Sequence, residues 1–255
     1  MESFIKNLAY GAGKILRDGF RKKMKIARKS GPHDIVTKYD FASERYIIGK
    51  IKGRFPGHGI ISEESNPEID NGKDTWIIDP LDGTNAFARG VAQFSVSIAY
   101  VHSQQLSLGV VYDPIADELF FAQAGHGAFL NNKKIRVSDR KELRGSLAIY
   151  SYNVNDTPLA TILKDTKAIS KAGLLPWCLC SSALDGAYVA SGRADLNIDR
   201  DAHPWDYAAG ALIMKEAGAK VTQADGKPYR WDSRSLLAAN PVLHKKIINT
   251  LNKRR

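Results

Sequence analysis

The sequence has 255 residues, enough to bury most of its apolar surface in one large domain or in two closely packed halves. Apolar residues make up 44% and charged residues 25%, proportions that exclude a disordered chain and are typical of a globular protein. No stretch approaches the roughly 18 apolar residues of a membrane-spanning helix, and the first residues lack the pattern of a signal peptide, so we expect a cytoplasmic protein with no membrane partner.

The charge balance is basic, because 37 lysines and arginines face 27 aspartates and glutamates. The excess is concentrated in residues 21–29 and in Lys253-Arg254-Arg255. Such segments favour an anionic partner, such as a phosphorylated substrate, RNA or another acidic surface, while a solvated helix face and a frayed tail are the competing interpretation. Aromatic residues that would stack on single-stranded nucleic acid are absent there, so nucleic acid stays an alternative that we do not favour.

The first half of the chain predicts two helices followed by strands. Apolar residues at helical spacing predict a helix over residues 2–27, and Lys29-Ser30-Gly31-Pro32 then signals a loop. A second helix is expected from near Asp40 to residue 51, followed by short apolar strands at 59–61 and 76–78. Four apolar segments separated by turns between residues 94 and 137 predict an antiparallel sheet.

The second half alternates between the two kinds of element. Strands are expected at residues 147–150, 194–198, 220–222 and 235–238, and helices near 158–171, 182–191, 204–217 and 241–252. Alternation of this kind indicates layered α/β structure. We interpret residues 1–255 as one domain with two subdomains and a soft boundary near residues 140–146.

Two carboxylates follow the apolar strand at residues 76–78. Asp79 and Asp82 have no lysine or arginine near them in the sequence, and buried carboxylates must pair with a cation. Two carboxylates and a backbone carbonyl on a tight turn suit a hard metal ion, and Gly83-Thr84 looks like a helix start whose N–H groups favour phosphate. An ordinary surface turn is the competing interpretation of this pentapeptide.

Two further acidic positions weaken the surface-turn interpretation. Glu63-Glu64 also follows directly after a short apolar strand. Asp206 lies near the start of a predicted helix, where capping of that helix is the competing interpretation.

The order and spacing of four motifs resemble the inositol monophosphatase family of metal-dependent, lithium-sensitive phosphatases. The matching segments are DIVTKYD at residues 34–40, Glu63-Glu64, DPLDGT at 79–84 and WDYAAG at 205–210. The match runs over nearly the whole chain, and the last motif is closest in form to the bacterial and archaeal inositol-1-monophosphatase-like branch. The resemblance implies a layered α/β/α/β/α sandwich of the inositol monophosphatase and fructose-1,6-bisphosphatase type, and a homodimer.

The resemblance also implies two or three Mg²⁺ ions in each active site. The residues that would hold the first two ions are Glu63, Asp79, the Leu81 carbonyl, Asp82 and Asp206, with Asp79 shared between both ions. All-oxygen ligation of this kind suits Mg²⁺. Lys29 belongs to the segment that matches the family's mobile lid loop, which helps to bind a third, weaker ion; an ordinary connector is the competing interpretation.

Catalytic roles follow from the same resemblance. Glu63 and Thr84 would position the attacking water, and Asp40 would hydrogen-bond to Thr84. The amides of Gly83 and Thr84 would bind the phosphate group, beside Asp82.

The substrate side departs from the family's usual pattern. Ser181, Ser182 and Ala183 match an element that lines the substrate pocket, and Asp199 stands where the family has a longer substrate-binding glutamate. The neighbouring Arg200 could meet a second phosphate group or pair with an adjacent aspartate.

We therefore expect a Mg²⁺-dependent phosphomonoesterase acting on inositol monophosphate or a related sugar phosphate. The alternatives within the enzyme class are fructose-1,6-bisphosphatase, 3′-phosphoadenosine nucleotide phosphatase and histidinol-phosphate phosphatase. An alternative from another class is a protein that binds RNA or a transcription complex, as some bacterial relatives do. The intact set of carboxylates favours an enzyme, because a pure binding module does not need all of them.

Overall fold

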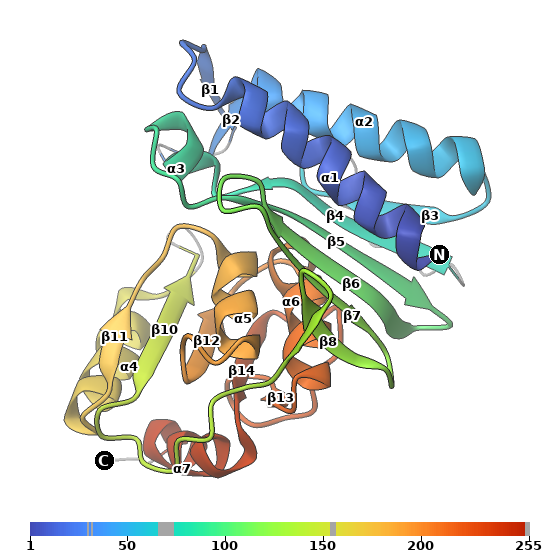
Figure 1. Ribbon diagram of the computed structural model, residues 1–255. Coiled ribbons are helices and arrows are strands. Elements are labelled where there is room, and N and C mark those ends of the chain that lie inside the picture. The colour runs from blue at the N-terminus through green and yellow to red at the C-terminus, as the bar shows by residue number, and fades with distance from the viewer. Residues whose placement is uncertain (30, 32, 66–73, 154–156, 253–255) are drawn as a thin grey trace.

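Helices and strands alternate in five layers (Figure 1). The computed structural model describes residues 1–29, 31, 33–65, 74–153 and 157–252, and every element below belongs to these residues. A helix pair, a seven-stranded sheet, a second helix pair, a five-stranded sheet and a third helix pair follow one another. The predicted α/β/α/β/α sandwich is confirmed.

The outer helices α1 (Glu2–Gly19) and α2 (Lys38–Arg54) cover one face of the larger sheet. The apolar stripe of α1 recurs every three or four residues, so it faces the sheet along the whole helix. Ile5 and Leu16 of α1 and Ile47 of α2 are fully buried in one cluster with Trp76 and Ile98 of the sheet. This packing fixes the start of α2, which carries part of the site described below.

The helix predicted over residues 2–27 ends early, at Gly19. The backbone leaves the helical conformation there, because Phe20 is extended (φ −60°, ψ 136°) and Arg21 takes a left-handed φ of 61°. The chain then forms strand β1 (Ile26–Arg28), which pairs antiparallel with β2 (Ile35–Thr37). The basic segment is therefore a loop followed by the exposed strand β1 instead of a longer helix, and β1 pairs with the buried strand β2.

The seven-stranded sheet contains the motif at residues 79–84. Its strands, in spatial order, are β3 (Gly59–Ser62), β4 (Asp74–Asp82), β5 (Ser95–His102), β6 (Gln105–Asp113), β7 (Glu118–Gln123), β8 (Gly127–Leu130) and β9 (Lys133–Ile135). The pairs from β5 to β9 are antiparallel, as predicted. Strand β4 does not stop at residue 78, because it continues through a register shift between Asp79 and Asp82 into the short helix α3 (Thr84–Ala88). Such a bulge re-aims side chains, which suits a functional site.

The middle layer consists of α5 (Ser182–Ala190) and α6 (Pro204–Glu216), enclosed between the two sheets. Small residues let these elements approach closely. A Cβ at Gly109 of β6 would lie 2.9 Å from the carbonyl oxygen of Ala209, and one at Gly186 would lie 3.3 Å from Gly210. This close packing places the N-terminus of α6, with Asp206, against the end of β4.

The five-stranded sheet follows residues 136–146, which connect it to the first sheet. Its strands, in spatial order, are β11 (Leu175–Trp177), β10 (Leu147–Tyr152), β12 (Leu196–Arg200), β14 (Ser235–Ala239) and β13 (Lys220–Thr222). Helices α4 (Leu159–Lys171) and α7 (Pro241–Asn252) pack on its outer face through Ile169, Leu243 and Ile247. Within the described ranges, none of the helices has the length and apolarity required to cross a membrane.

Candidate active site

An acidic cavity of about 180 Å³ lies where the ends of β3 and β4 meet the starts of α3 and α6. The residues that line it are His33, Asp34, Ile35, Glu63, Asp79, Leu81, Asp82, Gly83, Thr84, Asn85, Cys180 and Asp206. All five residues predicted to hold metal ions are among them, together with Gly83 and Thr84. Segments separated by more than 140 positions in sequence are thus brought to one cavity.

Asp79 and Asp82 are buried, Glu63 and Asp206 are partly exposed, and these carboxylates repel one another. Burial raises the pKa of Asp79 well above its ordinary value, and the negative charges of Glu63 and Asp82 raise it further. Burial also raises the pKa of Asp206, assisted by the charge of Asp199. The cavity therefore concentrates negative charge that only a cation or bound protons can neutralise.

Asp79 and Asp206 each accept a hydrogen bond from a backbone N–H group. Asp79 Oδ1 accepts from the backbone N–H of Leu81 at 3.0 Å, and Asp206 Oδ2 accepts from that of His203 at 2.6 Å, which caps α6. Asp206 thus combines the capping role and a position in the cavity. Within the described segments, no three His, Cys, Asp or Glu side chains are gathered closely enough to hold one metal ion.

Asp82 is held by the loop that precedes α5. It accepts hydrogen bonds from the Ser181 hydroxyl, from the backbone N–H groups of Ser182 and Ala183 at 3.1 Å each, and from the Ser95 hydroxyl at 3.0 Å. Sequence reasoning expected residues 181–183 to line the substrate pocket, and the structure gives them a different contact, to a predicted metal ligand. Four donors fix the orientation of the Asp82 carboxylate.

Gly83 fixes the turn that follows Asp82. Its φ of +90° lies in the left-handed region, and a Cβ would lie 2.7 Å from the Gln93 carbonyl oxygen and 2.9 Å from that of Cys180. Only glycine fits there. The bulge of β4 and the loop before α5 are consequently in direct backbone contact beside the cavity.

Thr84 connects the cavity to the start of α2. Its hydroxyl lies 2.9 Å from both Asp40 Oδ1 and the Leu81 carbonyl oxygen, so the predicted Asp40–Thr84 hydrogen bond is confirmed. Asp40 Oδ2 accepts from the N–H and the hydroxyl of Thr37, at 2.8 and 2.6 Å. Burial raises the pKa of Asp40 to about 6, although these hydrogen bonds oppose the shift.

Lys29 brings a positive charge into the cavity from the basic segment. Its Nζ lies 2.8 Å from Glu63 Oε1, 3.1 Å from Glu64 Oε1 and 3.5 Å from Asp34 Oδ1. Burial alone would lower the pKa of Lys29, but the two glutamates outweigh it and raise that pKa. Glu64 is buried, and burial with the charge of Glu63 raises its pKa to about 8. Two residues of the predicted lid loop, 30 and 32, lie outside the described residues.

Asp199 and Arg200 lie on opposite faces of β12, because successive strand residues alternate. Asp199 is buried and is not among the residues that line the cavity, and burial followed by the charge of Asp82 raises its pKa to about 7. Arg200 Nε instead donates to Asp165 Oδ2 of α4 at 2.8 Å. Neither sequence-based interpretation of Arg200, a second phosphate or an adjacent aspartate, anticipated this ion pair.

Two supporting residues escaped sequence reasoning. Thr37 stands three residues before Asp40, the spacing of a capping box, so its role was readable from the sequence. Ser95 begins β5 and reaches Asp82 only through strand pairing, and no local pattern marks it.

The donors in the cavity fit a hard divalent cation. They are carboxylate and carbonyl oxygens, without sulfur or imidazole ligands among the residues predicted to coordinate, and such a set suits ions that keep part of their water shell. Glu63, Asp79 and Asp206, the Leu81 carbonyl and the ordered Asp82 would hold it. A cation would also relieve the repulsion that raises these pKa values.

In excess chelator, we expect the melting temperature to fall as the pH rises from about 4.5 to 7.5. Asp40 and Asp82 have folded-state pKa values of about 6 and Asp199 of about 7, so the folded state holds protons that the unfolded chain releases near pH 4. A pKa difference of one unit between the folded and unfolded states corresponds to about 1.4 kcal/mol of unfolding free energy. In a protein of this size, a loss of about 1 kcal/mol lowers the melting temperature by roughly 2–4 °C, so we expect a fall of at least about 5 °C.

Calorimetry with and without a divalent cation measures this effect. The cation should raise the melting temperature more at pH 7.5 than at pH 5, because it competes with protons for the same carboxylates. Asp199→Asn should flatten the decline in chelator. A melting temperature that rises with pH in chelator would contradict the assigned shifts.

Comparison with known proteins identifies the fold and the motifs. The pattern of the inositol monophosphatase family matches residues 1–255. The fructose-1,6-bisphosphatase/inositol-1-monophosphatase of Thermotoga maritima is 36% identical, with 89% of this chain and 86% of the relative covered, and Nus factor SuhB of Pasteurella multocida is 37% identical, with 94% and 91% covered.

A solved structure has the same fold over the whole length of this chain. The extragenic suppressor protein suhB from Bartonella henselae superimposes with a TM-score of 0.93 at 31% identity, covering 100% of this chain and 99% of that one. Members of this family are phosphatases that hydrolyse phosphomonoesters and are generally metal-dependent. With its acidic cavity and the Thr84 contact in place, the chain belongs to the inositol monophosphatase family of phosphoric monoester hydrolases.

Proposed function

We propose that the protein hydrolyses inositol monophosphate or a related sugar phosphate with two or three bound Mg²⁺ ions. The observation that carries this proposal is the cavity itself, in which the four predicted carboxylate ligands and Leu81 lie beside Thr84. The similarity to the fructose-1,6-bisphosphatase/inositol-1-monophosphatase of Thermotoga maritima supports the substrate class. Bound Mg²⁺ would neutralise the phosphate charge and activate water.

Thr84 and Glu63 would orient the attacking water. The Thr84 hydroxyl proton is directed to Asp40 or to the Leu81 carbonyl, so its lone pairs remain free to accept a hydrogen bond from water. Asp40 is itself fixed by two bonds from Thr37, and this fixes the direction of the Thr84 hydroxyl. Water held in this way starts close to the direction of attack.

The leaving alcohol would meet a different part of the site. The phosphate group would lie against the backbone N–H groups of Gly83 and Thr84 at the start of α3. Asp199 would accept hydrogen bonds from sugar or inositol hydroxyls. Since Arg200 is paired with Asp165 on the other face of β12, we do not assign it a second phosphate.

The Thr84→Ala variant tests the hydrolytic mechanism. We expect kcat to fall by about 10²-fold with KM little changed, because the lost hydrogen bond orients water and does not bind substrate. Thr84→Ser keeps the hydroxyl and should retain most activity. Excess chelator should abolish turnover of the wild type, and Mg²⁺ should restore it. Full activity in chelator, or a raised KM at constant kcat, would refute the assignment.

The Asp199→Asn variant tests substrate choice. We expect kcat/KM on inositol monophosphate to fall by about ten- to a hundredfold, and on an aryl phosphate without hydroxyls by less than threefold, because only the polyol offers hydroxyls to this carboxylate. Equal losses on both substrates would show that Asp199 supports the fold or the cations instead.

We also propose that the protein forms a homodimer through the free edge of the smaller sheet. Strand β11 is exposed at all three positions, with Leu175 57% and Trp177 47% exposed. Pro176 between them offers no backbone N–H for strand pairing, so a second copy would bind through the exposed apolar side chains of Leu175 and Trp177. A second copy related by a two-fold axis would cover both side chains at once.

Sedimentation velocity of Trp177→Glu tests the dimer. We expect the variant to sediment as a monomer at concentrations where the wild type is dimeric, because a buried unpaired carboxylate opposes association. Ile115→Glu is the matched control, since Ile115 is also an exposed apolar residue but lies in the turn between β6 and β7. A monomeric wild type, or equal dissociation of both variants, would contradict the proposed interface.

A further inference from the structure

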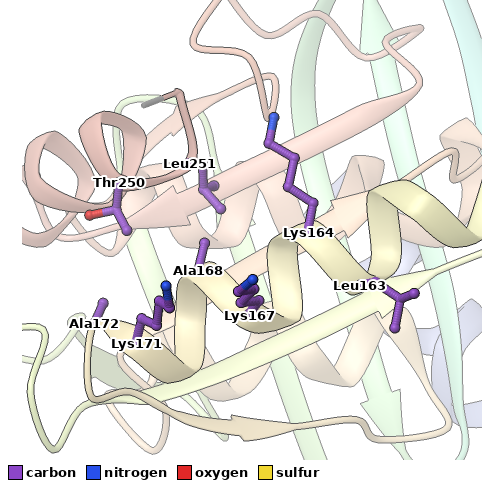
Figure 2. Close-up of a pocket in the computed structure, with 8 residues that line it drawn as sticks. All are labelled: Leu163, Lys164, Lys167, Ala168, Lys171, Ala172, Thr250 and Leu251. Carbon is purple, nitrogen blue, oxygen red and sulfur yellow. The ribbon is translucent and has the colours of Figure 1, made fainter. Parts of the chain in front are cut away.

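A second cavity lies on the outermost layer, between α4 and the end of α7 (Figure 2). Its volume is about 660 Å³, within the usual range of ligand-binding sites. The residues that line it are Leu163, Lys164, Lys167, Ala168, Lys171, Ala172, Thr250 and Leu251. We call it the α4–α7 groove. It lies on the face of the smaller sheet opposite α5 and α6, so it is separate from the active site.

The groove combines an apolar floor with a basic rim. Ala168, Ala172 and Leu251 supply small apolar surface, and Lys164, Lys167 and Lys171 project from α4 (Figure 2). The structure gives none of these three lysines an ion pair or a side-chain hydrogen bond with a described residue, unlike Lys6, Lys14 and Lys246.

Helix stability accounts for only part of this charge. Lys171 lies in the last turn of α4, where a cation stabilises the helix dipole. Lys164 lies in the middle of the helix and gains nothing from that effect. Next to it, the Leu163 side chain is 60% exposed although it is large and apolar. An unpaired basic row beside an exposed leucine indicates a surface that a partner covers.

We propose that the α4–α7 groove binds an acidic, amphipathic helix of a partner protein. The three lysines stand at positions i, i+3 and i+7, so they span about 10 Å along one face of α4. A partner helix with carboxylates at the same spacing would pair with all three, and its apolar side chains would cover Leu163 and the alanine floor.

The composition of the groove favours a protein over a nucleic acid. Its lining contains no aromatic side chain on which bases could stack, whereas single-strand binding surfaces combine basic residues with aromatic ones. A sugar-phosphate backbone is charged and polar, so it would gain little from contact with an apolar floor. Because the groove and the acidic cavity lie in different layers, a partner bound there leaves the cavity open to substrate.

Binding of two labelled peptides tests the inference. One is a 16-residue helical peptide with glutamates at i, i+3 and i+7 and leucines beside them; the other has the same composition in scrambled order. By fluorescence anisotropy we expect a micromolar Kd for the patterned peptide and a Kd at least about tenfold higher for the scrambled one. Equal affinities would overturn the proposal, as would no binding of the patterned peptide.

Charge-reversal variants locate the interaction. The variant K164E/K167E/K171E should weaken binding of the patterned peptide at least about tenfold. The matched control K52E/K133E/K134E makes the same charge change at exposed lysines elsewhere and should stay within about twofold. Unchanged phosphatase turnover in both variants shows that they fold. If both triple variants weakened peptide binding equally, the attraction would be non-specific and binding in the α4–α7 groove would be refuted.

A floor variant separates a protein partner from the alternatives. Ala168→Phe fills the groove without changing its charge, so it should weaken the patterned peptide at least about fivefold. A single-stranded RNA of equal charge should bind wild type and Ala168→Phe alike and more weakly than the peptide. Tighter binding of the RNA that is lost in K164E/K167E/K171E would assign the groove to nucleic acid. Dissociation of the dimer by that variant would assign it to a second copy, and either result overturns the proposal.

Discussion

Repulsion between buried carboxylates is the constraint on which the rest of the site depends. Asp79 and Asp82 of β4 are buried and Asp206 of α6 is partly exposed beside them, so solvent screens their charges only weakly. The fold tolerates them only because each accepts hydrogen bonds, Asp82 from four donors and Asp206 at the end of α6. Those bonds hold the carboxylates apart and in fixed directions, so a cation finds ligands that are already oriented.

The middle layer supplies the rigidity that this arrangement requires. Helix α6 is buried on nearly all sides, and it approaches β6 closely because Gly109 has no side chain. Contacts of this closeness transmit the position of the sheet directly to the N-terminus of the helix. The bulge in β4 and the left-handed Gly83 then aim Asp82 and Thr84 into the same cavity. The helical layer packed between the two sheets thus places Asp206 beside the residues of β4 that line the cavity.

Sequence reasoning located the cavity-lining carboxylates because motifs with hard-cation ligands at fixed spacing are local signals. The Asp40–Thr84 hydrogen bond was also predictable, although 44 residues separate the partners, because the family resemblance supplied it. The end of α1 was predicted wrongly, since the helical spacing continues past Gly19 although Phe20 is extended and Arg21 is left-handed. The Arg200–Asp165 pair and the Ser95–Asp82 bond depend on strand register and layer order, which no single segment encodes.

The basic charge of the whole protein and the acidic charge of the cavity have separate explanations. The protein carries a formal net charge of +10, yet its cavity is acidic and would repel a phosphorylated substrate. Bound cations would reverse that local sign, so under the proposed mechanism substrate binding would itself require them. Lys29 is the exception, because it already contributes positive charge at the rim of the cavity through Glu63. The lysine row on α4 lies in a different layer from the cavity, and its charge would be available to an acidic partner on the outer layer.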